Sequence, residues 1–300
     1  MRCDEIIQLL EKKAPIEYAM DWDHVGLLVG RRDKEVHKLM LVVDVTEEIV
    51  DAAVAQNVDM IVSHHPMIFG KVDRVNDETV LGRKILKLIE HGIACYAMHT
   101  NFDTIGGMAK EAAAMLGLQN MEVLEETKDG EGIGEVGYLP AATTVTALVV
   151  LIKEKFDLKN VILYGNPNDT VEKIAICPGS GKSVINEAVQ KKADCLITGD
   201  IGHHEGLDAN EMGLTILDAS HYGLEHIFMH IMYEYLKGYC MDVEIGISLN
   251  VTRASELDTL VQSLYESGKP RHVDSSVSFL MCGYSIGRVC LFTLDSFRFR

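Results

Sequence analysis

The sequence predicts an α/β protein whose sheets are mostly parallel. Short apolar runs alternate with amphipathic segments along most of the chain, which is the rhythm of strands and helices in α/β folds. Several of these runs are apolar throughout, as strands buried on both faces of a parallel sheet are. Several also end at a histidine or an acidic residue. Because ligands in open α/β sheets bind beyond the carboxyl ends of strands, these ends are the first place to look for a site.

The alternation allows the elements to be assigned in chain order. We expect strands at residues 39–43, 60–63, 93–98, 132–139, 161–164, 171–177, 195–198 and 214–217. We expect helices at residues 4–13, 47–56, 79–90, 108–116, 144–156, 182–191 and 221–236. Thr46 is a suitable N-cap for the second of these helices. Residues 251–300 break the pattern and are expected to form a divergent C-terminal tail.

Composition limits the classes of function. A chain of 300 residues that is 47% hydrophobic can form two ordinary domains or one large one with a sizeable core. Its net charge of −17 repels a phosphate backbone, which argues against nucleic acid as a partner. No apolar run approaches the roughly 20 residues that cross a bilayer. Seven cysteines without CxxC spacing, and acids where a signal peptide would be apolar, favour a cytoplasmic protein.

The sequence Ser63-His64-His65-Pro66 places two histidines where a buried strand should end. Neighbouring side chains of a strand point to opposite faces, so both imidazoles can reach one site only if the strand has already become a loop. Pro66 favours that break, because it removes a donor and restricts His65 to extended geometry. Alone, the pair fits either a metal site or two structural or solvated histidines.

Two further pairs favour the metal site. His99 and Asp103 lie four residues apart after one predicted strand, and His221 and Glu225 lie four apart after another. At a helix start this spacing puts both side chains on one face. Imidazole with carboxylate suits Zn, Fe, Mn, Co or Ni better than Ca or Mg. The number of ligands exceeds what one ion needs and suits a dinuclear site.

The His221–Glu225 pair could instead be a surface pair on a helix. We favour the ligand interpretation because Glu225 has apolar neighbours in the sequence. We expect Glu225 to bridge two ions from a rigid helix, and Asp103 to bind one ion from a loop.

Two other segments are weaker candidates. His203-His204-Glu205 follows Asp200 at the expected start of a helix, so we interpret it as a pocket rim that faces the substrate, or as a solvated helix start. Residues 178–183 resemble a phosphate-binding loop but lack the earlier glycine that such a loop requires. A tight strand-to-helix turn is therefore favoured there, and a weak anion site stays open.

Taken together and in this order, six motifs resemble the GTP cyclohydrolase I type 2 family, also called Nif-three-like dinuclear-metal proteins. The motifs are Asp21-Trp22-Asp23-His24-Val25-Gly26-Leu27, Ser63-His64-His65-Pro66, His99-Thr100-Asn101-Phe102-Asp103, Gly179-Ser180-Gly181, Thr198-Gly199-Asp200 and His221-Tyr222-Gly223-Leu224-Glu225. The resemblance covers roughly residues 1–250 and implies two interlocked α/β halves, about 1–126 and 127–250, with the metal site between them. It also implies a toroidal homohexamer. The larger insert domain of some members is absent.

The resemblance also implies specific site residues. The family's metal ligands correspond to His64, His65, Asp103, His221 and Glu225, which would hold two divalent ions. His99 matches a further histidine near the metals. Asp200 stands where the family often has glutamate. The candidate catalytic residues are therefore His99, Asp200 and His204.

The function that follows is hydrolysis of a nucleotide or a related small molecule, with two metal ions activating water at neutral pH. A two-metal phosphoesterase is the alternative among enzymes. A metal-handling or regulatory binding protein without turnover is the alternative outside them.

Overall fold

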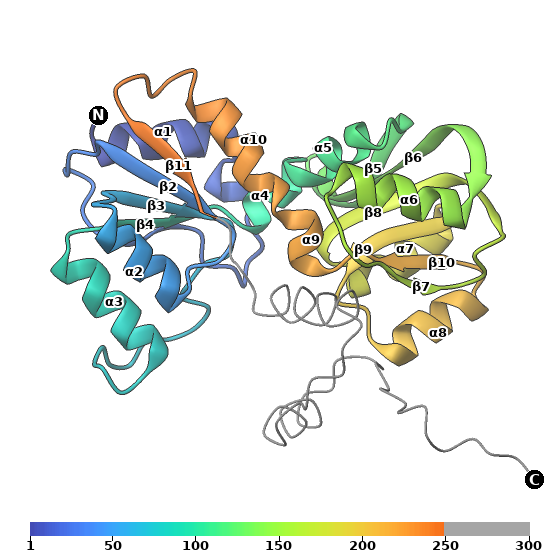
Figure 1. The fold of residues 1–300 in the computed structure, drawn as a ribbon, viewed down its shortest axis with the longest axis horizontal. Helices are drawn as coiled ribbons and strands as arrows, with labels where there is room; N and C mark the ends of the chain where they lie inside the picture. Colours follow the sequence, from blue (N-terminus) through green and yellow to red (C-terminus); the bar gives the residue numbers. More distant parts are fainter. Residues whose placement is uncertain (249–300) are drawn as a thin grey trace, which may run out of the picture. The chain divides into compact units, whose positions relative to one another are not determined.

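The first of two β-sheets has five strands. The computed structural model describes residues 1–248, so the predicted tail at 251–300 lies outside the described residues. The strands follow the order β1-β4-β3-β2-β11, with bounds Gly26–Val29 for β1, Lys38–Val42 for β2, Met60–Ser63 for β3, Ala94–Ala97 for β4 and Glu244–Ile247 for β11. All pairings are parallel except that of β1 with β4. The chain therefore returns to its first sheet at the end, where β11 lies beside β2 (Figure 1).

The second sheet has six strands in the order β5-β6-β8-β9-β10-β7. Their bounds are Gln119–Lys128 for β5, Glu131–Thr144 for β6, Ile162–Tyr164 for β7, Thr170–Ser180 for β8, Cys195–Gly199 for β9 and Thr215–Asp218 for β10. The central strands β8, β9 and β10 are parallel, and the flanking strands β5, β6 and β7 run antiparallel to their neighbours. The predicted α/β class with mostly parallel strands is confirmed.

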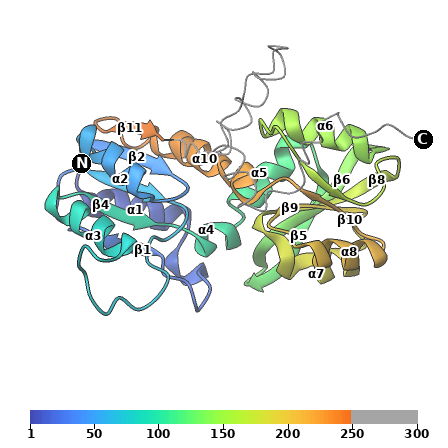
Figure 2. The same ribbon diagram turned by 60° about the horizontal axis from the view of Figure 1, so that its bottom comes forward.

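Helices cover both faces of each sheet. Their bounds are Cys3–Lys13 for α1, Glu47–Ala55 for α2, Val80–Glu90 for α3, Thr100–Thr104 for α4, Met108–Met115 for α5, Val145–Lys155 for α6, Ile185–Gln190 for α7, His203–Glu211 for α8, His221–Glu225 for α9 and Ile227–Leu236 for α10; short 3₁₀ turns are Ile16–Tyr18 (η1) and Gly181–Val184 (η2). Figure 2 shows α6 on one side of the second sheet and α7 and α8 on the other. The Thr46 hydroxyl accepts from Ile49 N and caps α2 as predicted. No helix of the described part of the chain is long and apolar enough to cross a membrane.

One apolar cluster joins the two sheets. Alternate residues of the central strands, such as Leu41 and Val62 in the first sheet and Ile176 and Ile197 in the second, belong to the same buried cluster. Helices α1, α5, α6 and α10 close this cluster, with Phe228 of α10 fully buried in it. Two smaller clusters lie on the opposite faces, under α2 and α3 and under α7 and α8. Since a shared core fixes both sheets, side chains at their strand ends can meet at defined distances.

The structure differs from the predicted elements in several places, and β1, β11 and α4 are among the elements that were not expected. Strand β5 was not expected, because its residues are mostly exposed and show no clear apolar alternation. The expected helix at 182–191 begins as the 3₁₀ turn η2 before α7. The expected helix at 221–236 is divided at His226 into α9 and α10.

In each sheet, an aspartate just before a central strand links that strand to its neighbour. One carboxylate oxygen of Asp59 accepts from the backbone N–H groups of His37 and Lys38 at 2.9 and 3.1 Å. Asp194 does the same for Glu172 and Lys173 at 2.9 and 2.8 Å. Burial opposes ionisation of Asp59, but these hydrogen bonds and Lys34 hold its pKa below the usual value. Each carboxylate thus ties the start of one strand to its neighbour.

Replacing Asp59 with asparagine is expected to lower the free energy of unfolding by about 1 kcal/mol at neutral pH, because an ionised acceptor of two N–H groups is lost. A carboxyl with a depressed pKa stabilises above its unfolded pKa, so the difference from the unsubstituted protein should shrink as pH falls below about 4. Denaturant unfolding at several pH values measures it. Asp73→Asn, in an exposed loop, is the control, and equal losses in both variants would contradict the role of Asp59.

Candidate metal centre

The five predicted ligands lie together at the carboxyl ends of three strands. His64 and His65 follow β3 directly, Asp103 lies just beyond β4, and His221 and Glu225 are the first and last residues of α9, after β10. Donor atoms of these residues lie within 3.0 to 3.7 Å of one another in neighbouring pairs. His64 and Glu225 are buried, whereas His65, Asp103 and His221 are partly exposed. The site therefore opens to solvent on one side.

Asp103 is not in a loop, as the sequence suggested, but in the one-turn helix α4. The N–H groups of Phe102 and Asp103 both donate to His99 O. Phe102 is fully buried edge-on against Phe228, and the Asn101 amide donates to Ala14 O at 2.8 Å. Tertiary contacts thus stabilise a helical turn that the local sequence does not predict. Burial raises the pKa of Asp103 to about 6 against the opposing effect of His64.

Four imidazoles at the site are oriented in the same way. The Nδ1 of each donates to an oxygen: His64 to Met98 O at 3.2 Å, His65 to Asp44 at 2.7 Å, His99 to Asp23 at 3.0 Å and His221 to Asp200 at 2.8 Å. A carbonyl or an ionised carboxylate can only accept, so the hydrogen is on Nδ1 in every case. In the neutral imidazole, each Nε2 is therefore the nitrogen that carries the lone pair. This is the orientation that supporting acceptors give to metal-binding histidines.

These lone pairs converge on Glu225. The Nε2 atoms of His65 and His221 lie 3.2 Å apart, and each is 3.0 Å from Oε2 of Glu225. Neither approach to Oε2 has the direction of a hydrogen bond, and within residues 1–248 this buried oxygen has no hydrogen-bonding partner. Two nitrogen lone pairs at 3.2 Å repel each other unless a cation or a proton lies between them. The donor set therefore fits a cation.

His64 contributes a third imidazole nitrogen to this arrangement. Its Nε2 lies 3.6 Å from Oε1 of Glu225 and 3.7 Å from Oδ2 of Asp103. This nitrogen is also buried without a hydrogen-bonding partner among residues 1–248. A buried polar atom left unpaired is costly, and a bound ion removes that cost. His64 is held by ring contacts to Phe228 and Phe102.

The charges at the site favour a cation between His65, His221 and Glu225. Burial opposes protonation of His65 and His221, but the hydrogen bonds to Asp44 and Asp200 and the close negative charge of Glu225 raise their pKa values to about 10 and about 9. Burial would also raise the pKa of Glu225, yet the imidazoles around it, His64 first, hold it well below its usual value. Only one proton fits between two Nε2 atoms 3.2 Å apart. A divalent ion would balance the negative charge of these carboxylates better than a single proton between the two imidazoles.

Within residues 1–248, two groups of side chains could hold a metal ion. They are His64, His65 and His99, and His65, His221 and Glu225, with the donor atoms of each group within 4.8 Å of one another. Nitrogen donors with a carboxylate suit Zn, Fe, Mn, Co or Ni. Asp103 faces the first group through its 3.7 Å approach to His64.

Glycines allow the chain to approach the site closely. A Cβ on Gly179, whose φ is +81°, would lie 2.5 Å from Oε1 of Glu225. A Cβ on Gly199 would lie 2.4 Å from His221 N. Larger residues at either position would displace the proposed ligands. The segment 178–183 is thus a tight turn, as favoured from the sequence, and its glycine makes room for Glu225.

The structure gives the three catalytic candidates different positions. His99 lies at the rim, with its ring 5.1 Å from that of His64 and 5.3 Å from that of His65. Asp200 contacts His221, so its role is to orient that imidazole. His204 lies in the first turn of α8, where its ring packs on His203 and Glu205 pairs with Lys182. No contact joins His204 to the metal-facing side chains of residues 1–248.

Comparison with known proteins identifies the family. Residues 1–256 match the family Duf34/NIF3 (NGG1p interacting factor 3). The chain belongs to the NIF3 family. It is 38% identical over 228 residues to the GTP cyclohydrolase 1 type 2 homolog of Clostridium perfringens, covering 75% of this chain and 87% of that protein. It is 33% identical over 257 residues to the homolog of Clostridium acetobutylicum, covering 84% and 96%.

Solved structures agree with this assignment. The Bacillus cereus protein related to NIF3 has a TM-score of 0.75 and 26% identity, covering 83% of this chain and 96% of that one. Reduced HcgD from Methanocaldococcus jannaschii has a TM-score of 0.73 and 30% identity, covering 82% and 97%. The resemblance inferred from the motifs is confirmed.

Sequence reasoning overlooked two supporting carboxylates of this NIF3-family site, Asp44 and Asp23. Asp44 directly follows the apolar run of β2, so the strand-end rule that singled out His64 applies to it as well. Asp23 accepts from His99, from Thr100 N and from the Thr100 hydroxyl. Although burial opposes it, these bonds hold the pKa of Asp23 well below its usual value. Both carboxylates orient imidazoles, but the sequence alone does not show which histidine each of them contacts.

Asp44→Asn and Asp200→Asn should each weaken metal binding about 10- to 100-fold, because each removes the charged acceptor that orients one imidazole. Competition with a chromogenic chelator measures the affinity. Asp208→Asn, on the exposed face of α8, is the matched control and should bind metal normally. Unchanged affinity in both site variants, with unchanged melting temperatures, would contradict the supporting role.

Proposed function

We propose that this NIF3-family protein is a metal-dependent hydrolase with a dinuclear centre, acting on a nucleotide or a related small molecule. The observation that carries the proposal is the convergence of three Nε2 atoms on the buried carboxylate of Glu225, with His64 Nε2 and Glu225 Oε2 lacking hydrogen-bonding partners among residues 1–248. A bound ion would satisfy these two buried atoms, which otherwise cost free energy by lacking partners. His65, His99, Asp103 and His221 are partly exposed, so a small molecule could reach the site.

The two oxygens of Glu225 support a dinuclear rather than a mononuclear centre. Oε1 faces His64, and Oε2 faces His65 and His221. A carboxylate with two differently surrounded oxygens is what a bridging ligand requires. Asp103, on the His64 side, would then bind one ion only. When bound, two divalent ions would supply Lewis acidity that activates water and polarises the substrate.

The remaining residues act by orientation and proton transfer. The Nδ1 hydrogen of His99 is held by Asp23, so its Nε2 is the atom that would accept a proton at the rim. Asp200 and Asp44 keep His221 and His65 in the orientation described above. His204 lies on the α8 turn beyond Asp200 and remains a candidate for contact with substrate.

The name GTP cyclohydrolase 1 type 2 homolog, borne by the clostridial relatives, supports a nucleotide as the first substrate to test. The experiment is anaerobic purification, elemental analysis, and a mass-spectrometric product screen over nucleotides and phosphoesters. A hydrolysed nucleotide base would support the proposal, and a cleaved phosphoester would support a two-metal phosphoesterase instead. Metal without any product would favour a metal-handling or regulatory protein, and absence of metal would refute the centre itself.

Glu225→Gln is expected to reduce both ions to substoichiometric occupancy and to abolish turnover, because it removes the charge that offsets repulsion between two cations. Asp103→Asn should mainly weaken one ion. Metal-to-protein ratios by elemental analysis distinguish the two variants. Two ions retained in Glu225→Gln, with both lost in Asp103→Asn, would show that Asp103 is the bridge.

We also propose that the protein assembles into a homohexamer, as the family resemblance implies. Light scattering should then give a mass six times the chain mass of 33.2 kDa. Salt up to 0.5 M tests whether the assembly survives screening of its charges, as an apolar interface would. A particle of one chain mass under both conditions would refute the assembly.

A further inference from the structure

Two exposed aromatic side chains flank His99 at the rim of the metal centre. Trp22 is 62% exposed and Phe69 is 59% exposed. Their ring centroids lie 5.9 and 6.1 Å from that of His99, and both meet it edge-on. They come from two separate segments, the stretch before β1 and the loop after β3. Two chain segments therefore present an aromatic face at the same imidazole.

The exposure of Phe69 stands apart from that of the other phenylalanines. Of the four phenylalanines in residues 1–248, the other three (Phe102, Phe156 and Phe228) are almost fully buried. Trp22 is the only tryptophan in the chain. Leaving such rings in water forgoes a large hydrophobic gain, and exposed aromatics beside a polar cluster mark binding surfaces. At this rim, the natural occupant is a molecule that also reaches the metal centre.

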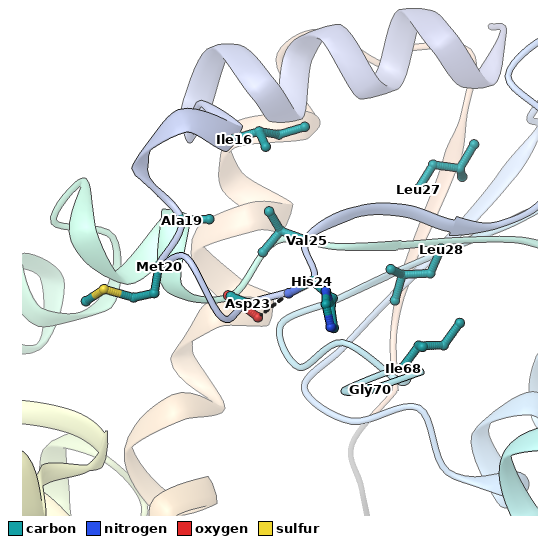
Figure 3. Close-up of a pocket in the computed structure, with 10 residues that line it drawn as sticks. All are labelled: Ile16, Ala19, Met20, Asp23, His24, Val25, Leu27, Leu28, Ile68 and Gly70. Atoms are coloured by element: carbon teal, nitrogen blue, oxygen red, sulfur yellow. Dashed lines mark hydrogen bonds between the residues drawn. The ribbon is translucent and has the colours of Figure 1, made fainter. Parts of the chain in front are cut away.

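A pocket of about 550 Å³ lies between the same two segments, and it is lined by the sequence neighbours of Trp22 and Phe69 rather than by these two rings themselves. Ile16, Val25 and Leu27 line it from one segment, and Ile68 lines it from the other (Figure 3). Asp23 also lines it and, through its bond to His99, joins the pocket to the metal centre. This volume is within the range of small-molecule sites, which is about 300–1,000 Å³.

The lining indicates which part of a ligand would enter. No lysine or arginine is among the described residues that line the pocket, and Asp23 contributes a negative charge. A phosphate would be repelled there, whereas an uncharged ring would gain apolar contacts. The His24 side chain, exposed at the wall, offers a hydrogen-bonding group to a ring edge. The four hydrogen bonds already accepted by Asp23 leave its carboxylate to orient His99 rather than ligand.

We propose that Trp22, Phe69 and this pocket form a subsite for a planar, uncharged heteroaromatic ring, such as a nucleobase. The rings of Trp22 and Phe69 stack on it, and His99 lies between the subsite and the metal-facing nitrogens. The part of the molecule attached to the ring then reaches the metal centre. As a substrate subsite the inference rests on the proposed function, but ring binding itself requires no turnover.

The single tryptophan makes the binding directly measurable. Guanosine, a nucleoside without phosphate, should quench the fluorescence of Trp22 saturably in the full-length protein, both metal-loaded and after chelation. Ribose 5-phosphate, which has no aromatic ring, should not. Phe69→Leu should weaken guanosine binding about tenfold, since stacking on one aromatic side chain is lost. Phe69→Tyr should bind as the unsubstituted protein does.

Val150→Ala, which truncates an equally exposed apolar residue on α6, is the matched control and should leave affinity unchanged. Trp22→Phe, followed by calorimetry, should retain most of the affinity because a ring is kept. Melting temperatures check that each variant is folded. Absence of saturable quenching by guanosine, adenosine and xanthosine, or equal affinity in Phe69→Leu, would overturn the subsite.

The outcomes separate this subsite from the proposed function. Ring binding that depends on Phe69, without any product in the screen, would support the subsite and count against the hydrolase. Turnover of a nucleotide with the same KM in Phe69→Leu would support the hydrolase and overturn the subsite.

Discussion

The structure depends on the burial of one carboxylate, that of Glu225, among three imidazole nitrogens. Almost no water reaches this group, and the charge can persist only because His64, His65 and His221 surround it. An isolated buried carboxylate would be strongly destabilising. Three features support this arrangement. Acceptors orient the imidazoles, glycines leave room for the ligand side chains, and Phe228 packs against the His64 ring. The two sheets are thus joined at a point where polar chemistry, as well as apolar packing, fixes their distance.

The aromatic residues beneath the His64 ring belong both to the apolar core and to the candidate metal centre. Phe228 packs against Phe102 and against the His64 ring, so it belongs to the core and to the site at once. Phe102 in turn shapes the helical turn that carries Asp103. Rigid packing holds the ligands at fixed distances, which is the condition for a preorganised centre.

Strand ends were predictable from the sequence, because apolar runs that stop at His64, His99 or Asp200 mark both the strand and its polar end. The pair His221–Glu225 was predictable because a helical repeat fixes its geometry. The turn at Asp103 was not, since it depends on contacts of Phe102 and Asn101 with distant residues. Strand β5 was missed because pairing with β6, rather than its own exposed and acidic sequence, makes it a strand. Asp44 and Asp23 required knowledge of which strand ends are neighbours.

The return of β11 to the first sheet has a consequence for biosynthesis. Strand β2 remains an open edge until residues 244–247 have been made, although the other strands of its sheet emerge from the ribosome within the first hundred residues. Helix α9, with two of the predicted ligands, is also translated after the second sheet. A nascent chain therefore carries an exposed strand edge for most of its synthesis, and such edges are prone to aggregation. An ion could therefore meet the full donor set only after residue 225 has emerged from the ribosome.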